Sequence, residues 1–267
     1  MSKKIHSSAI VDAGAQLGDD VEIGPFCIVG PKVRLGDGCR LMSHVVIDGE
    51  TVAGRNNLFF PGAAIGLVSQ DIKSLKDPVG RLVIGDNNTF RENTTMHPGT
   101  TKSRGETTIG NDNFFLVNSH VGHDCQIGNN ITLSNNSCIA GHCVLEDRVI
   151  VGGNSAVHQF CRLGEGSMIG GLSGIKDDLI PFGMVFGVSE LIGLNLVGLK
   201  RRGYEADTIN PLLQAYKQLF GREGTLKERV QKVKESYPDN VLVQKIIAFM
   251  EAGQDRGFCQ PSAAGRE

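Results

Sequence analysis

The stretch from Ile109 to Ile127 reads IGNDNFFLVNSHVGHDCQI, and it decides the fold. Every sixth residue is apolar, and this spacing continues without a break to Ile175. A period of six fits neither an α-helix, with about 3.6 residues per turn, nor a strand, whose side chains alternate with a period of about two. Hexapeptide repeats of this kind build a parallel β-helix, in which each unit supplies one short strand and one corner. The predicted inward-facing residues are Ile109, Phe115, Val121, Ile127, Leu133, Ile139, Leu145, Val151, Val157, Leu163, Ile169 and Ile175.

The same phase also organises the first part of the chain. It begins at Ile5, breaks between residues 67 and 83, and breaks again between residues 101 and 108. We count twenty-six six-residue units, and three units make one coil of eighteen residues. The sequence therefore predicts an all-β solenoid over residues 1–186, with inserted loops at 67–83 and 101–108. Insertions in a solenoid map to loops on one face, often the binding face.

Helical spacing replaces the period of six beyond Pro181. Apolar residues at this spacing run from Ile209 to Phe220, from Leu226 to Val233 and from Val243 to Met250. We interpret residues 187–267 as a C-terminal α-helical domain that covers the last coil, whose strand edge would otherwise lack a partner. The residues from about Gln254 onward show no pattern and are expected to be frayed.

Composition limits the classes of function. The net charge is −2, which predicts no nucleic-acid partner. The N-terminus has no apolar run behind its lysines, and no stretch approaches eighteen apolar residues, so we expect a cytoplasmic chain without an integral membrane segment. Cys125, Cys143 and Cys161 recur every eighteen residues, which indicates a ladder of small buried thiols, not a disulfide or zinc framework.

Histidines gather in the second half of the solenoid. With eighteen residues per coil, Gly141 lies one coil beyond His123, and His142 one coil beyond Asp124. A neutral imidazole can accept a proton near neutral pH, a neighbouring carboxylate can orient it, and a glycine exposes a backbone N–H that can bind an oxyanion. This combination suits acyl transfer to a hydroxyl, although any single histidine also fits a corner satisfied by hydrogen bonds. The clustered histidines are His97, His120, His123, His142 and His158.

A basic run, Lys200-Arg201-Arg202, opens the helical domain. Two interpretations stay open from the residues alone: a solvated helix face, or a contact with a phosphate or an acidic partner.

Several motifs, in this order, resemble the UDP-N-acetylglucosamine O-acyltransferases that begin lipid A synthesis. The resemblance covers nearly the whole chain, with both insertions in place. Hexapeptide repeats alone are shared by many acyltransferases, whereas the combination of motifs is specific. The motifs are Gln70-Asp71-Ile72-Lys73, Asn118-Ser119-His120-Val121-Gly122-His123-Asp124-Cys125, Gly141-His142, Val157-His158-Gln159-Phe160-Cys161, Gly170-Gly171 and Asn195-Leu196-Val197-Gly198-Leu199-Lys200-Arg201-Arg202-Gly203.

This resemblance implies a left-handed β-helix and a homotrimer with active sites between subunits. It implies that His123 is the general base, which takes the proton from the sugar 3-hydroxyl so that this oxygen attacks the thioester of a 3-hydroxyacyl chain. It implies that Gly141 donates the oxyanion hydrogen bond. No cofactor and no metal are implied, because the acyl donor is a thioester on the phosphopantetheine arm of acyl carrier protein. That partner is acidic, which suits the positive charge of Lys200-Arg201-Arg202.

The resemblance also implies a set of substrate-binding residues. Two positions near the expected nucleotide end depart from the family: Val197, where some members carry Glu, and Val188-Ser189, where Asn often follows the glycine. The acyl chain length, and the choice between a 3-hydroxyl and a 3-amino group on the sugar, stay open. The expected residues are Asp71 and Lys73 on the sugar, Gln70, His97, His120, His142 and His158 along the cleft, and Gln159, Asn195 and Arg201 on the nucleotide or the pantetheine arm.

Gly171 is expected to help set the acyl length. It follows Asn135 and Gly153 at intervals of eighteen, and it lies nearly three coils beyond His123. A residue without a Cβ leaves room for distal methylenes of an acyl chain. The alternative is a corner that needs left-handed backbone.

Three rival functions fit parts of the pattern. The N-acyltransferase that acts later in the same pathway has a separate domain before its repeats, but here the phase starts at Ile5. A carbonic-anhydrase-like β-helix would bind zinc with three histidines between subunits, yet the inserted loop and the C-terminal helices disfavour it. A non-enzymatic scaffold would show a regular array of one residue type, and the clustered histidines disfavour that.

Overall fold

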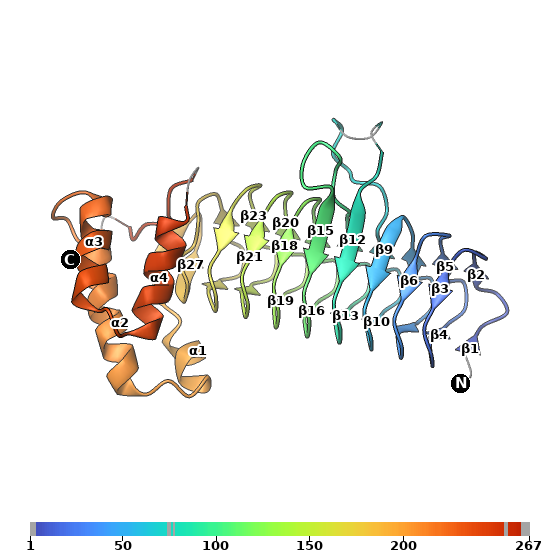
Figure 1. Cartoon of the computed structure of the whole chain (residues 1–267), viewed down its shortest axis with the longest axis horizontal. Helices are drawn as coiled ribbons and strands as arrows, with labels where there is room; N and C mark the ends of the chain where they lie inside the picture. The colour runs from blue at the N-terminus through green and yellow to red at the C-terminus, as the bar shows by residue number, and fades with distance from the viewer. Residues whose placement is uncertain (1–3, 74–75, 77, 254–255, 263–267) are drawn as a thin grey trace.

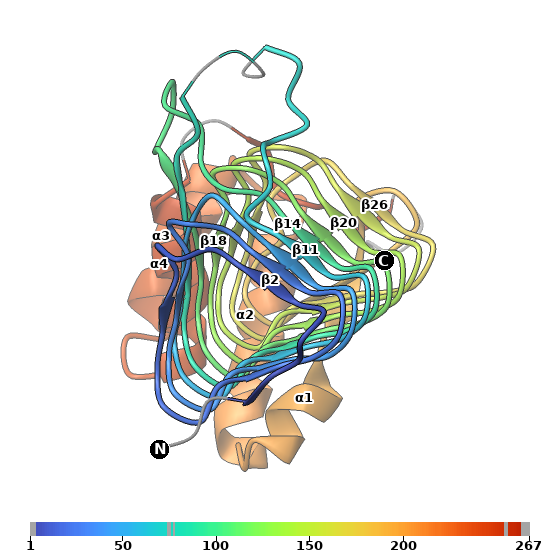
Figure 2. The ribbon, with the colours of Figure 1, turned by 90° about the vertical axis from the view of Figure 1, so that its right-hand side faces the viewer.

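The computed structural model describes residues 4–73, 76, 78–253 and 256–262. These residues form a long parallel β-helix with a bundle of helices at its C-terminal end and the N-terminus at the opposite end (Figure 1). Viewed along its length, the solenoid is a three-sided prism with stacked coils (Figure 2). The parallel β-helix with a C-terminal helical part, which the period of six predicts, is confirmed.

Three sheets make the sides of the prism, and we name them A, B and C in the order in which the chain visits them. Sheet A contains β1 (Lys4–Ile5), β4 (Glu22–Ile23), β7 (Arg40–Leu41), β10 (Leu58–Phe59), β13 (Thr89–Phe90), β16 (Phe114–Phe115), β19 (Thr132–Leu133), β22 (Ile150–Val151), β25 (Met168–Ile169), β27 (Gly183–Phe186) and β28 (Glu190–Leu194). Sheet B contains β2 (Ile10–Val11), β5 (Ile28–Val29), β8 (Val46–Ile47), β11 (Ala64–Ile65), β14 (Thr95–Met96), β17 (His120–Val121), β20 (Cys138–Ile139), β23 (Ala156–Val157) and β26 (Gly174–Ile175). Sheet C contains β3 (Gln16–Leu17), β6 (Arg34–Leu35), β9 (Glu50–Ala53), β12 (Arg81–Ile84), β15 (Glu106–Ile109), β18 (Gln126–Ile127), β21 (Val144–Leu145) and β24 (Arg162–Leu163).

Each strand from β1 to β26 ends at a residue that the six-residue phase assigns to the interior. Successive coils pair in parallel at intervals of eighteen residues, as Gln126 does with Val144 and Val144 with Arg162. From the second coil onward these inward-facing residues are buried. In the first coil Ile5 is exposed, and Val11 and Leu17 are only partly covered, because no coil of the described residues packs on their outer side.

Phenylalanines stack inside the middle of the solenoid. The rings of Phe59 and Phe90 lie 4.8 Å apart between centroids, and those of Phe90 and Phe115 lie 5.0 Å apart. All three are fully buried. Equivalent positions of successive coils therefore bring like side chains into contact across the whole core.

The corners use left-handed backbone. At most of them the third residue after the inward-facing one has φ near +60°, as in Asn118, Asn136 and Asn154. Asparagine tolerates this conformation better than other residues with a Cβ. The side-chain amide of Asn118 donates to Oδ1 of Asn136 at 3.0 Å, so the corner residues also form a ladder.

Both insertions leave the prism at the edge where sheet B turns into sheet C (Figure 2). The first is the connection between β11 and β12 and the second is the connection between β14 and β15, so the second insertion includes Thr100, just before the predicted loop 101–108. The strands that receive the chain again, β12 and β15, begin at Arg81 and Glu106, two or more residues inside the predicted loops. The four-residue strands β9, β12 and β15 pair side by side in sheet C at this level.

Four helices follow the solenoid: α1 (Leu196–Arg201), α2 (Ala206–Leu219), α3 (Leu226–Ser236) and α4 (Val241–Glu251). The last two strands, β27 and β28, lie at or beyond residue 183, so sheet A continues past the predicted domain boundary at residue 186. Thr225 and Glu228 form a capping box at the start of α3, and Asn240 caps α4. Among the described residues, no helix has the length and apolar content that crossing a bilayer requires.

The prediction that the chain frays from about Gln254 is wrong for residues 256–262. This segment returns to the last coil, where Phe258 and Gln260 form bridges with Asp178 and Glu190. Its side chains lack a helical or strand period because it makes only isolated bridges, so a pattern search could not find it. Gln254 itself lies outside the described residues.

Candidate active site

The clustered histidines lie at the edge between sheets B and C, which also carries both insertions. His120 belongs to β17, and the others follow β14, β17, β20 and β23. The strand register places His97, Gly122, Ala140 and His158 in one column, as the eighteen-residue spacing predicts. The residues of this edge are His97, His120, His123, Asp124, Gly141, His142, His158 and Gln159.

His123 and Asp124 form a hydrogen-bonded pair at the centre of this edge. Nδ1 of His123 lies 2.8 Å from Oδ2 of Asp124, and the Asp124 side chain is completely buried. An ionised carboxylate only accepts hydrogen bonds, so Nδ1 of His123 carries a proton and donates it. Nε2 of His123 consequently presents a lone pair. This is the tautomer that a general base requires.

The second insertion holds the carboxylate in place. The backbone N–H of Thr100 donates to Oδ1 of Asp124 at 3.0 Å, and the Thr100 hydroxyl donates to Oδ2 at 2.7 Å. The backbone N–H of Asp124 donates to the hydroxyl of Thr107 at 2.8 Å. Sequence reasoning missed Thr100, because the insertion has no period from which its position could be inferred.

Gly141 lies against the free nitrogen of His123. A Cβ on Gly141 would lie 2.6 Å from Nε2 of His123, and a Cβ on Gly122 would lie 2.7 Å from the nitrogen of Gly141. Glycine is required at both positions, because a side chain at either would collide. Among the described residues the N–H of Gly141 has no hydrogen-bond acceptor, so it is available to a ligand beside the base.

His142 packs over His123 and under Phe160. Its ring meets the His123 ring edge-on at 4.8 Å and stacks on Phe160 at 4.4 Å, and Nδ1 lies 3.2 Å from the hydroxyl of Ser103. Burial lowers the pKa of His142, although the negative charge of Asp124 opposes the shift. Sequence analysis missed Phe160 as a site residue; its φ of +66° does not distinguish it, because Phe26, Leu172 and Phe182 adopt the same conformation at other corners.

His97 and His120 anchor the first insertion. The backbone N–H of Gln70 donates to Nδ1 of His97 at 3.4 Å, and the Gln70 side chain lies 3.3 Å from Nε2 of His120. Nδ1 of His120 lies 2.7 Å from the Thr95 hydroxyl. Burial lowers the pKa of His97, and burial with the nearby charges of His97 and His123 lowers the pKa of His120 to about 4. Both rings are therefore neutral at pH 7.

The first insertion thus brings Asp71 and Lys73 to the same edge. The backbone N–H of Lys73 donates to Oδ1 of Asp71 at 3.2 Å, and the Lys73 side chain is exposed. Asp71 is near enough to His142 to act on its charge. Lys102 of the second insertion donates to the carbonyl of Lys73 at 3.5 Å, which joins the two loops.

Three predicted substrate-binding residues lie elsewhere in the chain. Gly171 lies at the edge between sheets A and B, so sheet B separates it from His123. Asn195 caps α1: its Oδ1 accepts from the N–H of Gly198 at 2.9 Å, and its amide donates to the carbonyl of Gly166 at 3.1 Å. Arg201 is exposed at the end of α1.

The basic run separates into two parts. Lys200 and Arg201 are exposed, as a partner contact would require. Arg202 turns inward, pairs with Glu165 at 2.7 Å and lies over the ring of Phe182. This third charge belongs to the contact between the helical part and the solenoid.

One group of possible metal ligands comes together among the described residues: the nitrogens of His123 and His142 and an oxygen of Asp124, all within 4.8 Å of one another. Both oxygens of Asp124 already accept hydrogen bonds from Thr100, and Oδ2 also accepts from His123. This donor set suits an oriented base better than a three-histidine zinc site.

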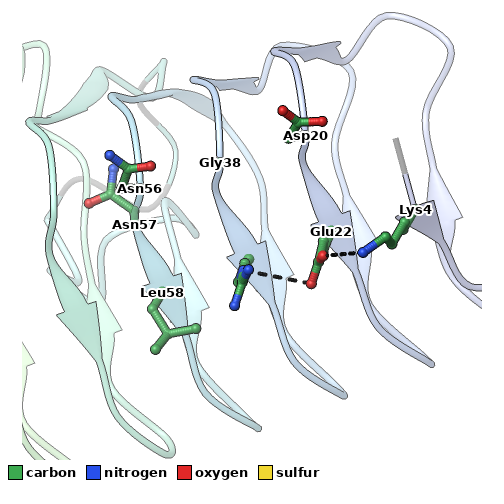
Figure 3. A pocket seen from close by; sticks show the side chains of 8 residues that line it. Lys4, Asp20, Glu22, Gly38, Asn56, Asn57 and Leu58 are labelled. Atoms are coloured by element: carbon green, nitrogen blue, oxygen red, sulfur yellow. Dashed lines mark hydrogen bonds and ion pairs between the residues drawn. The ribbon is translucent and has the colours of Figure 1, made fainter. Parts of the chain in front are cut away.

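A hollow on sheet A, near the N-terminal end, lies far from the clustered histidines (Figure 3). It has a volume of about 600 Å³, and three of its four charged side chains pair with one another. Glu22 binds Lys4 at 2.7 Å and Arg40 at 3.6 Å. These residues are mutually satisfied and lack a nucleophile or base, so they do not make a second reactive site.

Comparison with known proteins agrees with this geometry. Residues 178–259 match the family described as Udp N-acetylglucosamine O-acyltransferase, domain 2, and residues 14–49 and 106–141 match the bacterial transferase hexapeptide repeat. The chain is 51% identical to the acyl-[acyl-carrier-protein]–UDP-N-acetylglucosamine O-acyltransferase of Rickettsia canadensis, over 97% of this chain and 98% of the relative. The enzyme of the same name from Thermodesulfovibrio yellowstonii is 45% identical, over 96% of this chain and 99% of the relative.

Solved structures give the same result. LpxA from Acinetobacter baumannii superposes with a TM-score of 0.92 at 41% identity, covering 96% of this chain and 99% of that chain. The UDP-N-acetylglucosamine acyltransferase of Francisella novicida superposes with a TM-score of 0.93 at 36% identity, covering 98% of this chain and 95% of that chain. The β-helix is left-handed, which confirms the expectation from the family resemblance. The chain is an O-acyltransferase and belongs to the UDP-N-acetylglucosamine O-acyltransferase family.

Proposed function

We propose that this enzyme transfers a 3-hydroxyacyl chain from acyl carrier protein to the 3-hydroxyl of UDP-N-acetylglucosamine, the first step of lipid A synthesis. The names of its relatives, which specify an acyl carrier protein donor and a UDP-N-acetylglucosamine acceptor, support the substrates. The observation that carries the chemistry is the His123–Asp124 pair beside the uncovered N–H of Gly141.

In the proposed mechanism His123 acts first as base and then as acid. Its Nε2 takes the proton of the sugar hydroxyl while that oxygen bonds to the thioester carbonyl carbon, and the buried carboxylate of Asp124 stabilises the imidazolium. The N–H of Gly141 donates to the oxyanion of the tetrahedral intermediate. When the intermediate collapses, the carbon–sulfur bond breaks and the thiolate takes the proton from Nε2. An ester and a free pantetheine thiol leave.

The remaining site residues would bind the substrates. Asp71 is partly buried and Lys73 is exposed on the anchored first insertion, and Asp71 acts on the charge of His142, which suits contact with the sugar hydroxyls. His158 and Gln159 are exposed further along the same edge. The role of Asn195 would be indirect, since its amide already caps α1, whereas Arg201 is exposed and can meet an acidic partner.

We propose a homotrimer with its active sites between subunits. His123 and Gly171 lie at different edges of one prism, so a single cleft can contain both only if two chains contribute to it. Sheet B, which separates these edges, presents apolar residues outward: Ile10 and Ile28 are 66% and 43% exposed. Covering them in an assembly would be favourable.

The direct test is to incubate the pure protein with UDP-N-acetylglucosamine and a panel of 3-hydroxyacyl carrier proteins, and to identify products by mass. We expect an ester of the intact UDP-sugar with at least one donor, and at least about a hundredfold slower ester formation with the His123→Ala variant. A wild-type protein that makes no acylated UDP-sugar with any donor would disprove the proposed function.

A further inference from the structure

The segment from Arg256 to Ser262 is held firmly against the last coil. The N–H of Asp178 donates to the carbonyl of Gly257, and the N–H of Cys259 donates to the carbonyl of Asp178, both at 2.8 Å. Cys259 is 1% exposed. Backbone bonds and burial therefore fix the position from which the Arg256 side chain reaches out.

Arg256 reaches from this segment to His158. Its Nη1 donates to the carbonyl of Lys176 at 2.5 Å, and its Nη2 lies 2.9 Å from Nδ1 of His158. A guanidinium has donors only and stays protonated, so Nδ1 of His158 must present its lone pair. The carbonyl of Gln159, 3.1 Å from the same Nδ1, would bind the other tautomer. The arginine excludes that tautomer, and the proton of the neutral ring is placed on Nε2.

Nε2 of His158 is the atom left for a ligand. Among the described residues no acceptor for it is found, and the side chain is exposed at the edge that carries His123. Arg256 also lines a hollow of about 760 Å³ together with His142 and Phe160. A ligand that reaches Nε2 of His158 meets an N–H donor only if the tautomer is the one that Arg256 selects.

We propose that Arg256 is a positioning residue: it holds His158 as the Nε2–H tautomer, so that His158 donates a hydrogen bond to a phosphoryl or carbonyl oxygen of the bound substrate. The functional half of this inference rests on the proposed function, in which His158 contacts substrate. The tautomer itself does not depend on that function.

Nuclear magnetic resonance of protein labelled with ¹⁵N-histidine tests the tautomer directly, with His158→Gln to assign the signal. We expect the proton on Nε2 in the wild type and a shift toward Nδ1–H in Arg256→Met, because the carbonyl of Gln159 then becomes the partner of Nδ1. A wild-type His158 with its proton on Nδ1, or a tautomer unchanged in folded Arg256→Met, overturns the inference whether or not the enzyme is active.

Kinetics test the coupling. Losing one oriented hydrogen bond should raise KM for the UDP-sugar about tenfold in Arg256→Met, with kcat changed less than about twofold. Arg256→Lys, which keeps a donor, should retain most of the affinity, and Arg222→Met, which removes an exposed arginine elsewhere, serves as the control. In the His158→Gln background Arg256→Met should have no further effect; an equal loss there would contradict a role through His158.

Discussion

His123 depends on its two neighbours for its chemistry. Asp124 fixes the proton on Nδ1 and turns Nε2 toward Gly141. The same buried carboxylate offsets the charge that appears on the ring when it takes a proton. Removing the Asp124 carboxylate would leave an imidazole that still binds protons but no longer holds the orientation that transfer requires.

Replacing His123 by Ala should reduce kcat by about 10²–10⁴-fold, which is the usual value of a general base. The fold should persist, because His123 lies at a corner outside the core. The measurement is steady-state transfer to the UDP-sugar, with circular dichroism to verify folding. A folded variant within a few-fold of the wild-type rate would remove His123 from the mechanism.

The corner backbone at this edge is itself informative. His142 and Phe160 adopt φ +64° and +66°, as bulky residues such as Phe26, Leu172 and Phe182 do at other corners. Left-handed backbone costs a residue with a bulky Cβ substituent about 1–2 kcal/mol. At this edge the two left-handed corners stack the rings of His142 and Phe160 beside His123.

His120 should make stability depend on pH. Its folded-state pKa is lowered from 6.5 to about 4, so between these values the unfolded chain binds a proton that the folded chain does not. Stability is then fully present above pH 6.5 and falls as the pH approaches 4, by at most about 3 kcal/mol. Urea unfolding at pH 7 and pH 4.5 should show a smaller loss for His120→Asn than for the wild type.

The exposed His6 provides the matched control. His6→Asn should leave the pH dependence of stability unchanged. Equal losses in the wild type and in His120→Asn would show that other groups control the acid sensitivity.

The two insertions make different contacts at the edge between sheets B and C. The first is tied to His97 and His120 by Gln70 and presents exposed side chains. The second supplies Thr100, which reaches inward to the buried carboxylate of Asp124. In the proposed mechanism one loop would therefore face the substrate, and the other would support the base.

Thr100→Val should test the supporting loop. The change keeps the side-chain shape but removes the hydroxyl that donates to Asp124 at 2.7 Å. A buried carboxylate that loses one partner costs about 1–3 kcal/mol, and we expect kcat to fall roughly tenfold as the His123 ring loses its fixed orientation. Thr101→Val, at the exposed neighbouring position, should leave both unfolding and kcat unchanged. Normal kcat in Thr100→Val would mean that the backbone N–H alone holds Asp124.

The sequence predicts the regular elements well because every coil repeats the same pattern, an inward-facing apolar residue at every sixth position. The strands end at the inward-facing residues, and the histidine column follows from a spacing of eighteen. Thr100 and Arg256 escape prediction since their segments follow no period and their contacts arise only in three dimensions. The placement of Gly171 relative to His123 was predictable: they are 48 residues apart (171 − 123 = 48), which is not a multiple of eighteen, so they must lie at different edges.

For the whole molecule, we expect an assembly of three chains. Light scattering should give a mass of about 86 kDa, three times the 28.6 kDa of one chain. Activity should be lost together with the trimer on dilution, because a single prism encloses no thioester. A fully active monomer would refute the shared site.

Gly171→Met should shift the preferred acyl donor to a shorter chain. Gly171 lacks positive φ, so no left-handed corner requires glycine there. A Cβ at this position would lie 3.4 Å from the carbonyl oxygen of Gly153. Within 4 Å it would meet only the backbone of Gly153, so its own chain leaves room for a longer side chain. If that side chain borders the acyl chain, each acyl methylene that it excludes loses about 0.8 kcal/mol of burial. A donor panel that gives one chain-length profile for both trimeric proteins would show that Gly171 does not border the acyl chain.

The two ends of the solenoid are not equivalent. At one end β27, β28, the helices and the segment 256–262 cover the last coil, while at the other the inward-facing Ile5 is 45% exposed and, among the described residues, β1, β2 and β3 each pair with one strand. In a stack where each coil touches only the next, loss of order starts where a neighbour is missing and advances coil by coil. We therefore expect local unfolding to begin in the N-terminal coils, where amide hydrogens should exchange first. Several coils must then unfold before the loss of order extends to His123.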